Sequence, residues 1–242
     1  MTGLRKSDDA YGHQIKRHVE SGTFEVIERD DGLVEAYSSA YLFSPYRLWP
    51  PQEKKAIRLA RGRVLDVGAG GGRVSLYLQG RGHDVVAIDI STGAVETCRE
   101  RGVKVARVLP FEKIDASLGV FDTVVMFGNN FGLFGSPSRA KMLLRRLHRM
   151  TSERARILGE TLDPYDTEDP DHLSYHKRNK LRGRWPGQLR IRARHRKLKT
   201  PWFDYLFVSR KEMERLVDGT GWHVARFIEP TGHQYIGVLE KA

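Results

Sequence analysis

The stretch Val64-Leu65-Asp66-Val67-Gly68-Ala69-Gly70-Gly71-Gly72 decides the fold. Its apolar run leads directly into glycines, which predicts a buried strand whose carboxyl end meets a tight turn and then a helix. Glycine at such a turn tolerates unusual dihedral angles and lets a ligand approach the backbone. The stretch therefore predicts a ligand site at the carboxyl end of a strand.

The spacing of these glycines argues against a dinucleotide site. A dinucleotide fingerprint places a glycine three positions after its second glycine. Counted from Gly68 and Gly70, that position holds Arg73, and the spacing is G-x-G-x-G through Gly72. A dinucleotide site also has no need of a carboxylate at Asp66. A nicotinamide oxidoreductase is therefore disfavoured.

The same strand-then-helix pattern repeats along the chain. Apolar runs lie at 63–70, 83–89, 103–109, 121–128 and 155–162, with helical segments expected after the glycine turn through Leu78, at 92–101 and at 137–150. Such alternation indicates a parallel sheet covered by helices on both faces. We predict a doubly wound, mostly parallel seven-stranded α/β sheet, closed by an antiparallel C-terminal strand. The last two strands, 224–230 and 234–241, would pair around Thr231-Gly232.

Two segments flank this pattern. Residues 1–49 are polar and aromatic, with helix-like stretches at 14–21 and 33–42, and we expect them to form a lid or arm on a domain spanning 50–242. Within that domain, 164–208 is predicted to be a basic β-hairpin insertion. Its first strand, 188–194, alternates apolar residues with arginines, and 202–209 would be its partner. Ser209 and Glu212 then form a capping box that starts a helix.

The positive charge is concentrated in this insertion. The chain carries a net charge of +11, and residues 171–200 hold eleven basic residues and one acid, so the remainder is nearly neutral. A charge run is usually a solvated surface. The alternative is a surface for an anionic partner, with Arg190, Arg192 and Arg194 forming a solvent-facing row.

The glycine stretch resembles the first motif of the class I S-adenosylmethionine-dependent methyltransferases, and Asp89, 23 residues after Asp66, fits the second. The resemblance implies a Rossmann-like methyltransferase fold, an enzyme, and S-adenosylmethionine as cofactor. It places Asp66 at the methionine ammonium group and Asp89 at the ribose hydroxyls. The cofactor-binding residues expected on this basis are Asp66, Gly68, Ala69, Gly70, Gly72, Asp89, Ile90, Val108, Phe127 and Gly128.

The third family motif is where this sequence departs from the pattern. Many members place an acid after the third strand to accept a hydrogen bond from the adenine, but no acid stands at the end of 103–109. Backbone groups around Val108, or the Glu112 carboxylate, are the remaining candidates for that contact. The resemblance covers roughly residues 46–165 with specific motifs.

Methyl transfer from a sulfonium is an in-line displacement, so the enzyme must mainly align the acceptor and exclude water. A base is needed only where the acceptor must lose a proton. The catalytic candidates are Asn129 and Asn130 after the fourth strand, and Tyr175 and His176 in the insertion; Glu160, Asp163, Tyr165 and His172 are further candidates by position. No spacing signature selects among them, and no metal site is expected.

Two functions remain in contention. The first is methylation of a small molecule, an anionic one if the arginine row lines its pocket. The second is methylation of RNA, with the basic segment 171–200 holding phosphates. A catalytically silent cofactor-binding protein is a third hypothesis, opposed by the intact glycine loop and both acids. The single cysteine, Cys98, and the lack of an apolar segment of about 18 residues predict a cytoplasmic protein without membrane contact.

Overall fold

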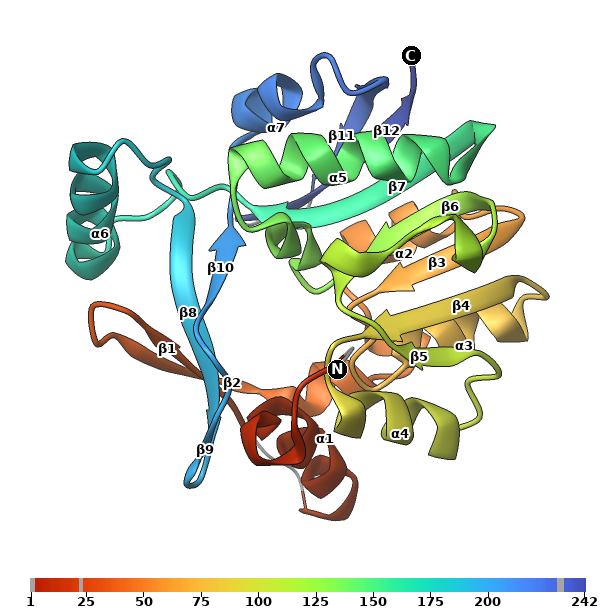
Figure 1. Ribbon diagram of the computed structural model, residues 1–242, viewed down its shortest axis with the longest axis horizontal. Coiled ribbons are helices and arrows are strands. Elements are labelled where there is room, and N and C mark those ends of the chain that lie inside the picture. The colour runs from red at the N-terminus through yellow and green to blue at the C-terminus, as the bar shows by residue number, and fades with distance from the viewer. Residues whose placement is uncertain (1–2, 22–23, 230–232) are drawn as a thin grey trace.

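The computed structural model describes residues 3–21, 24–229 and 233–242 (Figure 1). A seven-stranded mixed sheet forms its centre, in the order β11-β12-β7-β6-β3-β4-β5. The strands are β3 (Arg63–Val67), β4 (Asp84–Asp89), β5 (Ala106–Val108), β6 (Phe121–Met126), β7 (Thr151–Leu162), β11 (Trp222–Ile228) and β12 (Gln234–Lys241). Strands β3 to β7 run parallel to one another. Beyond β7, β12 pairs antiparallel with β7, and β11 pairs antiparallel with β12. The α/β Rossmann-like fold is confirmed.

Helices cover both faces of this sheet because its strands are apolar on both sides. The elements on one face are α2 (Pro51–Ile57), α3 (Arg73–Gly80) and α4 (Thr92–Glu100), and those on the other are α5 (Pro137–Arg149) and α7 (Arg210–Val217). Alternate residues of β3 divide between the two layers, since Val64 packs with α2 and α3 while Leu65 packs with α5. This arrangement brings the carboxyl ends of β3, β4 and β6 to one edge.

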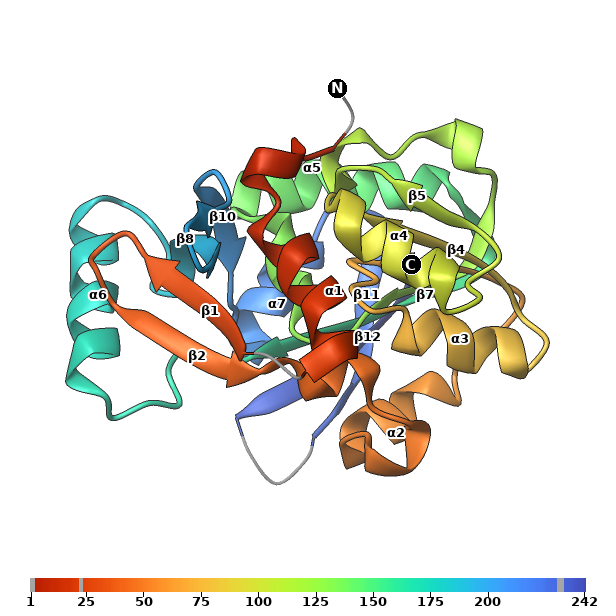
Figure 2. The same ribbon diagram turned by 90° about the horizontal axis from the view of Figure 1, so that it is seen from below.

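A second sheet joins strands from the second half of the insertion to the N-terminal segment. Its order is β10-β8-β1-β2, with β9 beside β8. The strands are β1 (Phe24–Arg29), β2 (Val34–Ser38), β8 (Gln188–His195), β9 (Leu198–Lys199) and β10 (Phe203–Leu206). Helix α1 (Ala10–Ser21) lies between this sheet and α4, as Figure 2 shows. Strands of the N-terminal segment and of the insertion therefore share one sheet beside the large sheet.

The helix expected at 33–42 is wrong for most of its length: Val34–Ser38 form β2, which pairs antiparallel with β1, and only a short 3-10 helix (Ser39–Phe43) follows. The structure also contains a helix that was not predicted, α6 (Pro170–Leu181). Pro170 occupies its first turn, where no backbone N–H is required, and the Asp169 side chain caps its N-terminus. The Thr231-Gly232 turn lies outside the described residues.

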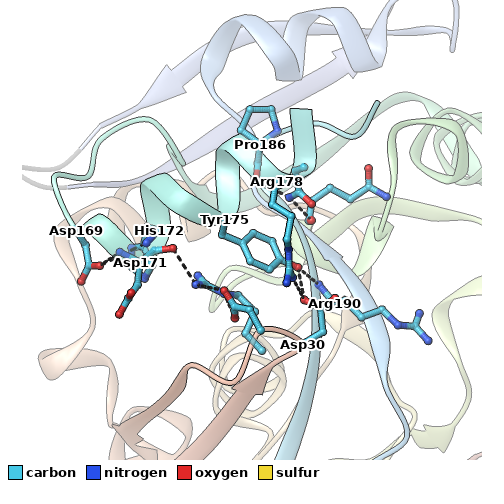
Figure 3. A network of polar contacts seen from close by, with 12 residues as sticks. Asp30, Asp169, Asp171, His172, Tyr175, Arg178, Pro186 and Arg190 are labelled. Carbon is cyan, nitrogen blue, oxygen red and sulfur yellow. Dashed lines mark hydrogen bonds and ion pairs between the residues drawn. The ribbon is translucent and has the colours of Figure 1, made fainter. Parts of the chain in front are cut away.

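Helix α6 is tied to the second sheet by a polar network (Figure 3). The Tyr175 hydroxyl donates to Asp30 Oδ1 at 2.7 Å and accepts from the backbone N–H of Arg190 at 3.1 Å. Arg178 donates to the same Asp30 oxygen, and the Asn179 side chain donates to the carbonyl of Pro186. The basic helix is thus anchored to the β1–β2 turn and to β8.

Candidate functional site

Asp66 lies at the carboxyl end of β3 as a buried carboxylate, 3 % exposed. Its Oδ2 accepts a hydrogen bond from the Ser75 hydroxyl of α3 at 2.6 Å. Burial raises the pKa of Asp66 to about 6, although the Ser75 hydroxyl and the nearby Arg73 charge oppose the shift. A buried acid with a pKa of about 6 is readily ionised when a cationic ligand group binds beside it.

Asp89 ends the neighbouring strand β4 and is also buried. Its two oxygens accept backbone N–H groups, one from Gly70 at 3.0 Å and one from Ser91 at 2.9 Å. Burial raises the pKa of Asp89 to about 6 even with these hydrogen bonds. The carboxylate therefore holds the glycine loop in place beside the end of its own strand.

The glycine loop is also fastened to the segment after β6. Asn130 Nδ2 donates to the carbonyls of Val67 and Gly68 at 3.0 and 2.9 Å. Gly68 has a φ of +71°, and a Cβ there would lie 2.5 Å from Asn130 Nδ2. Only glycine fits this position, because both the dihedral angle and the contact exclude a side chain.

A covered cavity lies between these strand ends and the N-terminal segment. The residues that line it are Tyr11, Tyr41, Leu42, Asp66, Gly68, Ala69, Arg73, Val74, Phe127, Gly128 and Asn130. Five expected cofactor residues are among them: Asp66, Gly68, Ala69, Phe127 and Gly128. Gly70 borders the N-terminal segment, since a Cβ there would lie 3.1 Å from the Tyr11 hydroxyl, and Gly72 precedes α3 with a φ of +78°.

The expected adenine side is bordered by residues before α1. The backbone N–H of Leu4 donates to the carbonyl of Ile90 at 3.1 Å, and Gly3 lies against Val108. Glu112 is directed elsewhere, because its carboxylate accepts from Arg139 of α5 at 3.1 Å. Of the two adenine partners considered from the sequence, the backbone around Val108 is therefore the better placed.

Arg73 belongs to a buried polar cluster that sequence reasoning missed. Its guanidinium makes a bidentate ion pair with Glu53 of α2 at 2.5 and 2.6 Å and lies over the Trp49 ring. Glu160 of β7 accepts the Gly128 N–H at 2.5 Å, and burial together with Glu53 raises the pKa of Glu160 to about 8. The only sign of this cluster in the sequence was Arg73, which served there to show that the third glycine of a dinucleotide fingerprint is missing.

The catalytic candidates are dispersed. Asn130 lines the cavity, and Asn129 beside it has a left-handed backbone (φ 63°) and accepts the Tyr205 hydroxyl on its carbonyl at 2.6 Å. Tyr175 lies instead in the α6 network, and His176 stands on the same helix 6.2 Å from the Tyr165 ring. Neither α6 residue borders the cavity.

Of the further positional candidates, Glu160 binds the backbone of Gly128 at the cavity, whereas Asp163, Tyr165 and His172 are engaged away from it. The Tyr165 hydroxyl donates to Glu212, and His172 contacts the Thr167 hydroxyl. Asp163 accepts the Tyr165 N–H and pairs with Arg210. These residues hold the start of the insertion against α7, which gives them structural partners.

Four residues near the cavity escaped sequence reasoning as a group: Glu25, Tyr11, Tyr41 and Tyr205. The Tyr41 hydroxyl donates to Glu25 Oε2 at 3.0 Å, and burial raises the pKa of Glu25. These side chains come from α1, β1, the 3-10 helix after β2, and β10. They come together because β8 pairs with both β1 and β10, so no local sequence motif predicts this group.

The arginine row is balanced by acids. Arg192 makes a bidentate pair with Glu28 at 2.8 and 2.9 Å, Arg194 lies 3.4 Å from the same carboxylate, and Arg190 lies 3.2 Å from Asp204. The arginines do lie on the face opposite the apolar residues of β8, as the alternation predicts. The predicted solvent-facing row is partly exposed, and its charge is offset because both neighbouring strands supply carboxylates.

A different part of the insertion is strongly basic. A surface cavity between α1 and the β8–β9 turn is lined by His13, Lys16, Arg17, His195, Arg196, Lys197 and Leu198. Lys16 pairs with Glu96 of α4. The lining thus gathers basic side chains from two segments that lie far apart in the sequence.

Comparisons with known proteins agree with this geometry. A family model described as a methyltransferase domain matches residues 64–154. The structure superposes on an S-adenosylmethionine-dependent methyltransferase from Bacteroides fragilis, crystallised with S-adenosyl-L-homocysteine, with a TM-score of 0.84 and 25 % identity over 100 % of this chain and 98 % of that one.

Two more distant structures share the fold. The CcbJ methyltransferase from Streptomyces caelestis has a TM-score of 0.63 and 16 % identity, covering 97 % of this chain and 99 % of that one. The 1,6-didemethyltoxoflavin-N1-methyltransferase of Burkholderia thailandensis has a TM-score of 0.51 and 18 % identity, covering 79 % of each chain. No helix in the described part of the chain is long and apolar enough to cross a membrane.

Proposed function

Because the chain is a class I S-adenosylmethionine-dependent methyltransferase, we propose that it methylates a small molecule held beside the covered cavity. The observation that carries this proposal is the cover itself. Tyr11, Tyr41 and Leu42, all from the N-terminal segment, line the cavity together with Asp66 and the glycine loop. A cover of this kind suits a small acceptor, because it excludes water from the reacting groups.

Residues of the cavity, together with Asp89 at the adjoining end of β4, suit the cofactor. We propose that Asp66 holds the methionine ammonium group and that Asp89 accepts the ribose hydroxyls. Both are buried carboxylates, and burial raises the pKa of each. Binding of an ammonium group or of hydroxyl groups would give each carboxylate charge a partner. The loop at Gly68 and Gly70 gives the backbone close access to the ligand. When bound, the cofactor supplies an electrophilic methyl group on a positively charged sulfur.

The segment 1–49 is proposed to act as the lid. Asp9 fastens it to the domain, accepting the Gly93 N–H at 2.9 Å and the Ser91 hydroxyl at 3.0 Å with Oδ2. Its Oδ1 accepts the Gly12 N–H at 2.9 Å, which places the start of α1 beside α4. Tyr11, two residues after Asp9, is thereby positioned over Gly70.

Transfer of an isotopically labelled methyl group from S-adenosylmethionine into a cell extract tests the proposal. After separation into RNA, protein and small-molecule fractions, the label should enter the small-molecule fraction. An Asp89→Ala variant should lower that transfer, and an Asp84→Ala variant, changed at the exposed start of the same strand, should not. Label confined to RNA or to protein would refute a small-molecule acceptor.

RNA methylation is the second candidate, and the basic surface cavity between α1 and the β8–β9 turn favours it. Arg196 and Lys197 can be reversed together to glutamate, with Lys55→Glu/Lys104→Glu as an exposed control of equal charge. If RNA is the substrate, its binding should fall steeply with salt, and the first double variant alone should abolish RNA methylation. Equal effects of both variants would indicate non-specific attraction of a polyanion.

A further inference from the structure

The second sheet presents a carboxylate next to the covered cavity. Glu25 stands on β1, and its Oε2 accepts the Tyr41 hydroxyl at 3.0 Å. Tyr41 itself lines the cavity beside Asp66 and Asn130, and a Cβ on Gly128 would lie 3.6 Å from its ring. Only the Tyr41 side chain therefore connects Glu25 to the cavity where the methyl donor is proposed to bind.

The surface around Glu25 is largely apolar. Strand register places Ile27 opposite Ala193, Phe203 opposite Ile191, and Tyr205 opposite Leu189, so these side chains share the face of Glu25. Directly opposed residues of antiparallel strands point to the same side of a sheet. The arginine row and its acids point to the other side. Tyr37 lies opposite Glu25, Glu35 opposite Ile27 and Arg29 opposite Ile191, so these three side chains share the face as well. An acceptor approaching the cavity along this face would meet mainly apolar and aromatic groups and the carboxylates of Glu25 and Glu35, while Arg29 is paired with Asp31.

Aromatic rings complete the surroundings. The Tyr205 hydroxyl donates to the Asn129 carbonyl at 2.6 Å, and a Cβ on Gly132 would fall 2.1 Å from the Tyr205 ring, so this ring lies against the loop after β6. Burial raises the pKa of Tyr11, Tyr41 and Tyr205 well above the usual range, and the Glu25 charge adds to each shift. All three rings are therefore neutral, and neutral aromatic faces attract cations.

We propose that Glu25, with Tyr11, Tyr41 and Tyr205, forms the acceptor site, and that the acceptor is an amine attached to an apolar group. The inference rests on the proposed small-molecule function. A carboxylate beside neutral aromatic rings favours an ammonium group and disfavours a phosphate or a carboxylate, whose charge it would repel. The reason for expecting an anionic acceptor was the arginine row, which faces away and is paired with acids.

The chemistry requires one proton acceptor. An acceptor bound as an ammonium ion has no free lone pair and must first lose one proton, which Glu25 is placed to take and to release to solvent. The lone pair of the neutral amine then forms the bond to the methyl carbon while the carbon–sulfur bond breaks and its electron pair stays on sulfur. The methylated product is again an ammonium ion and leaves in that form. Burial raises the pKa of Glu25, which makes its carboxylate a better proton acceptor than an exposed glutamate.

The test uses trideuteromethyl-labelled S-adenosylmethionine, the full chain and a small-molecule extract. Mass spectrometry identifies each labelled product, and fragmentation separates N-methyl from O-methyl and C-methyl groups. We expect N-methyl products. Glu25→Gln should lower their rate of formation at least tenfold and raise the KM of the identified amine, while calorimetric binding of S-adenosylhomocysteine stays unchanged. Glu25→Asp should restore part of the activity.

Glu28→Gln is the matched control, because Glu28 lies on the same strand but on the arginine face. It should leave N-methylation unchanged. Labelled O-methyl or C-methyl small molecules, or full activity in Glu25→Gln, would overturn the amine inference and leave the small-molecule function standing. Label that enters only RNA or protein would overturn both.

Discussion

Replacement of Asp66 by asparagine separates the demands of folding from those of cofactor binding. The amide keeps the size of the side chain and an oxygen that can accept the Ser75 hydroxyl, but it removes the buried charge. Burial raises the pKa of Asp66 from 3.8 to about 6. A shift of about two units corresponds to about 3 kcal/mol of unfavourable free energy at pH 7, since one unit is about 1.4 kcal/mol.

The sign of the effect depends on pH. With a raised pKa in the folded state, Asp66 lowers the free energy of unfolding as pH rises from about 4 to about 6, and the loss then stays constant. Without ligand, Asp66→Asn should therefore be more stable than the wild type at pH 7, by up to about 3 kcal/mol, and nearly equal to it near pH 4. Its affinity for S-adenosylhomocysteine should nevertheless fall, because the ammonium group of the ligand loses its carboxylate partner.

Urea denaturation at pH 4, 5, 6 and 7, with and without S-adenosylhomocysteine, measures both quantities. Asp122→Asn on β6 is a control of opposite sign, since hydrogen bonds from Ser152 and the Arg63 N–H lower the pKa of Asp122. That variant should be less stable than the wild type at pH 7. If Asp66→Asn is also less stable at pH 7, or if it binds the ligand normally, Asp66 is a structural cap and the reasoning fails.

Two further outcomes follow from the same site. Affinity for S-adenosylhomocysteine should fall as pH drops through about 6, by up to about tenfold per pH unit for each acid, because Asp66 and Asp89 must lose a proton to bind. Calorimetry from pH 5 to 8 measures this dependence, and an affinity that does not change with pH would contradict it. Asp9→Ala should speed proteolytic cleavage within residues 1–21, because three hydrogen bonds that dock α1 are lost. Cleavage at the wild-type rate would show that the lid is held by other contacts.

Sequence reasoning could place Asp66 and Asp89 together at one edge of the sheet because the signals for these two acids are local. Asp66 and Asp89 each end a continuous apolar run, and parallel strands carry their carboxyl ends to one edge. Arg73 was visible, but its partners were not, since Glu53 lies on α2 and Glu160 on β7. A buried cluster of this kind depends on which helix covers which strand.

The acceptor side was beyond sequence reasoning for a related reason. Glu25 and Tyr205 are 180 positions apart, and they share a face only because β8 pairs with both β1 and β10. The stretch 33–42 contains good helix formers, yet pairing with β1 makes Val34–Ser38 a strand, so tertiary contacts override local preference. Helix α6 carries a proline at its start, Pro170, which is a weak helix signal in a sequence although the first helical turn tolerates it.

Calorimetric titration with S-adenosylhomocysteine of the wild type, Asp89→Ala and Asp84→Ala tests the cofactor site most directly. Asp84 is the first residue of β4 and Asp89 is its last, so a general loss of folding would affect both variants alike. Hydrogen bonds to a charged group contribute about 1.5–3 kcal/mol, so Asp89→Ala should bind roughly ten- to a hundredfold more weakly than the wild type. Asp84→Ala should match the wild type. Normal binding by Asp89→Ala would contradict the assignment of the cofactor to this edge of the sheet.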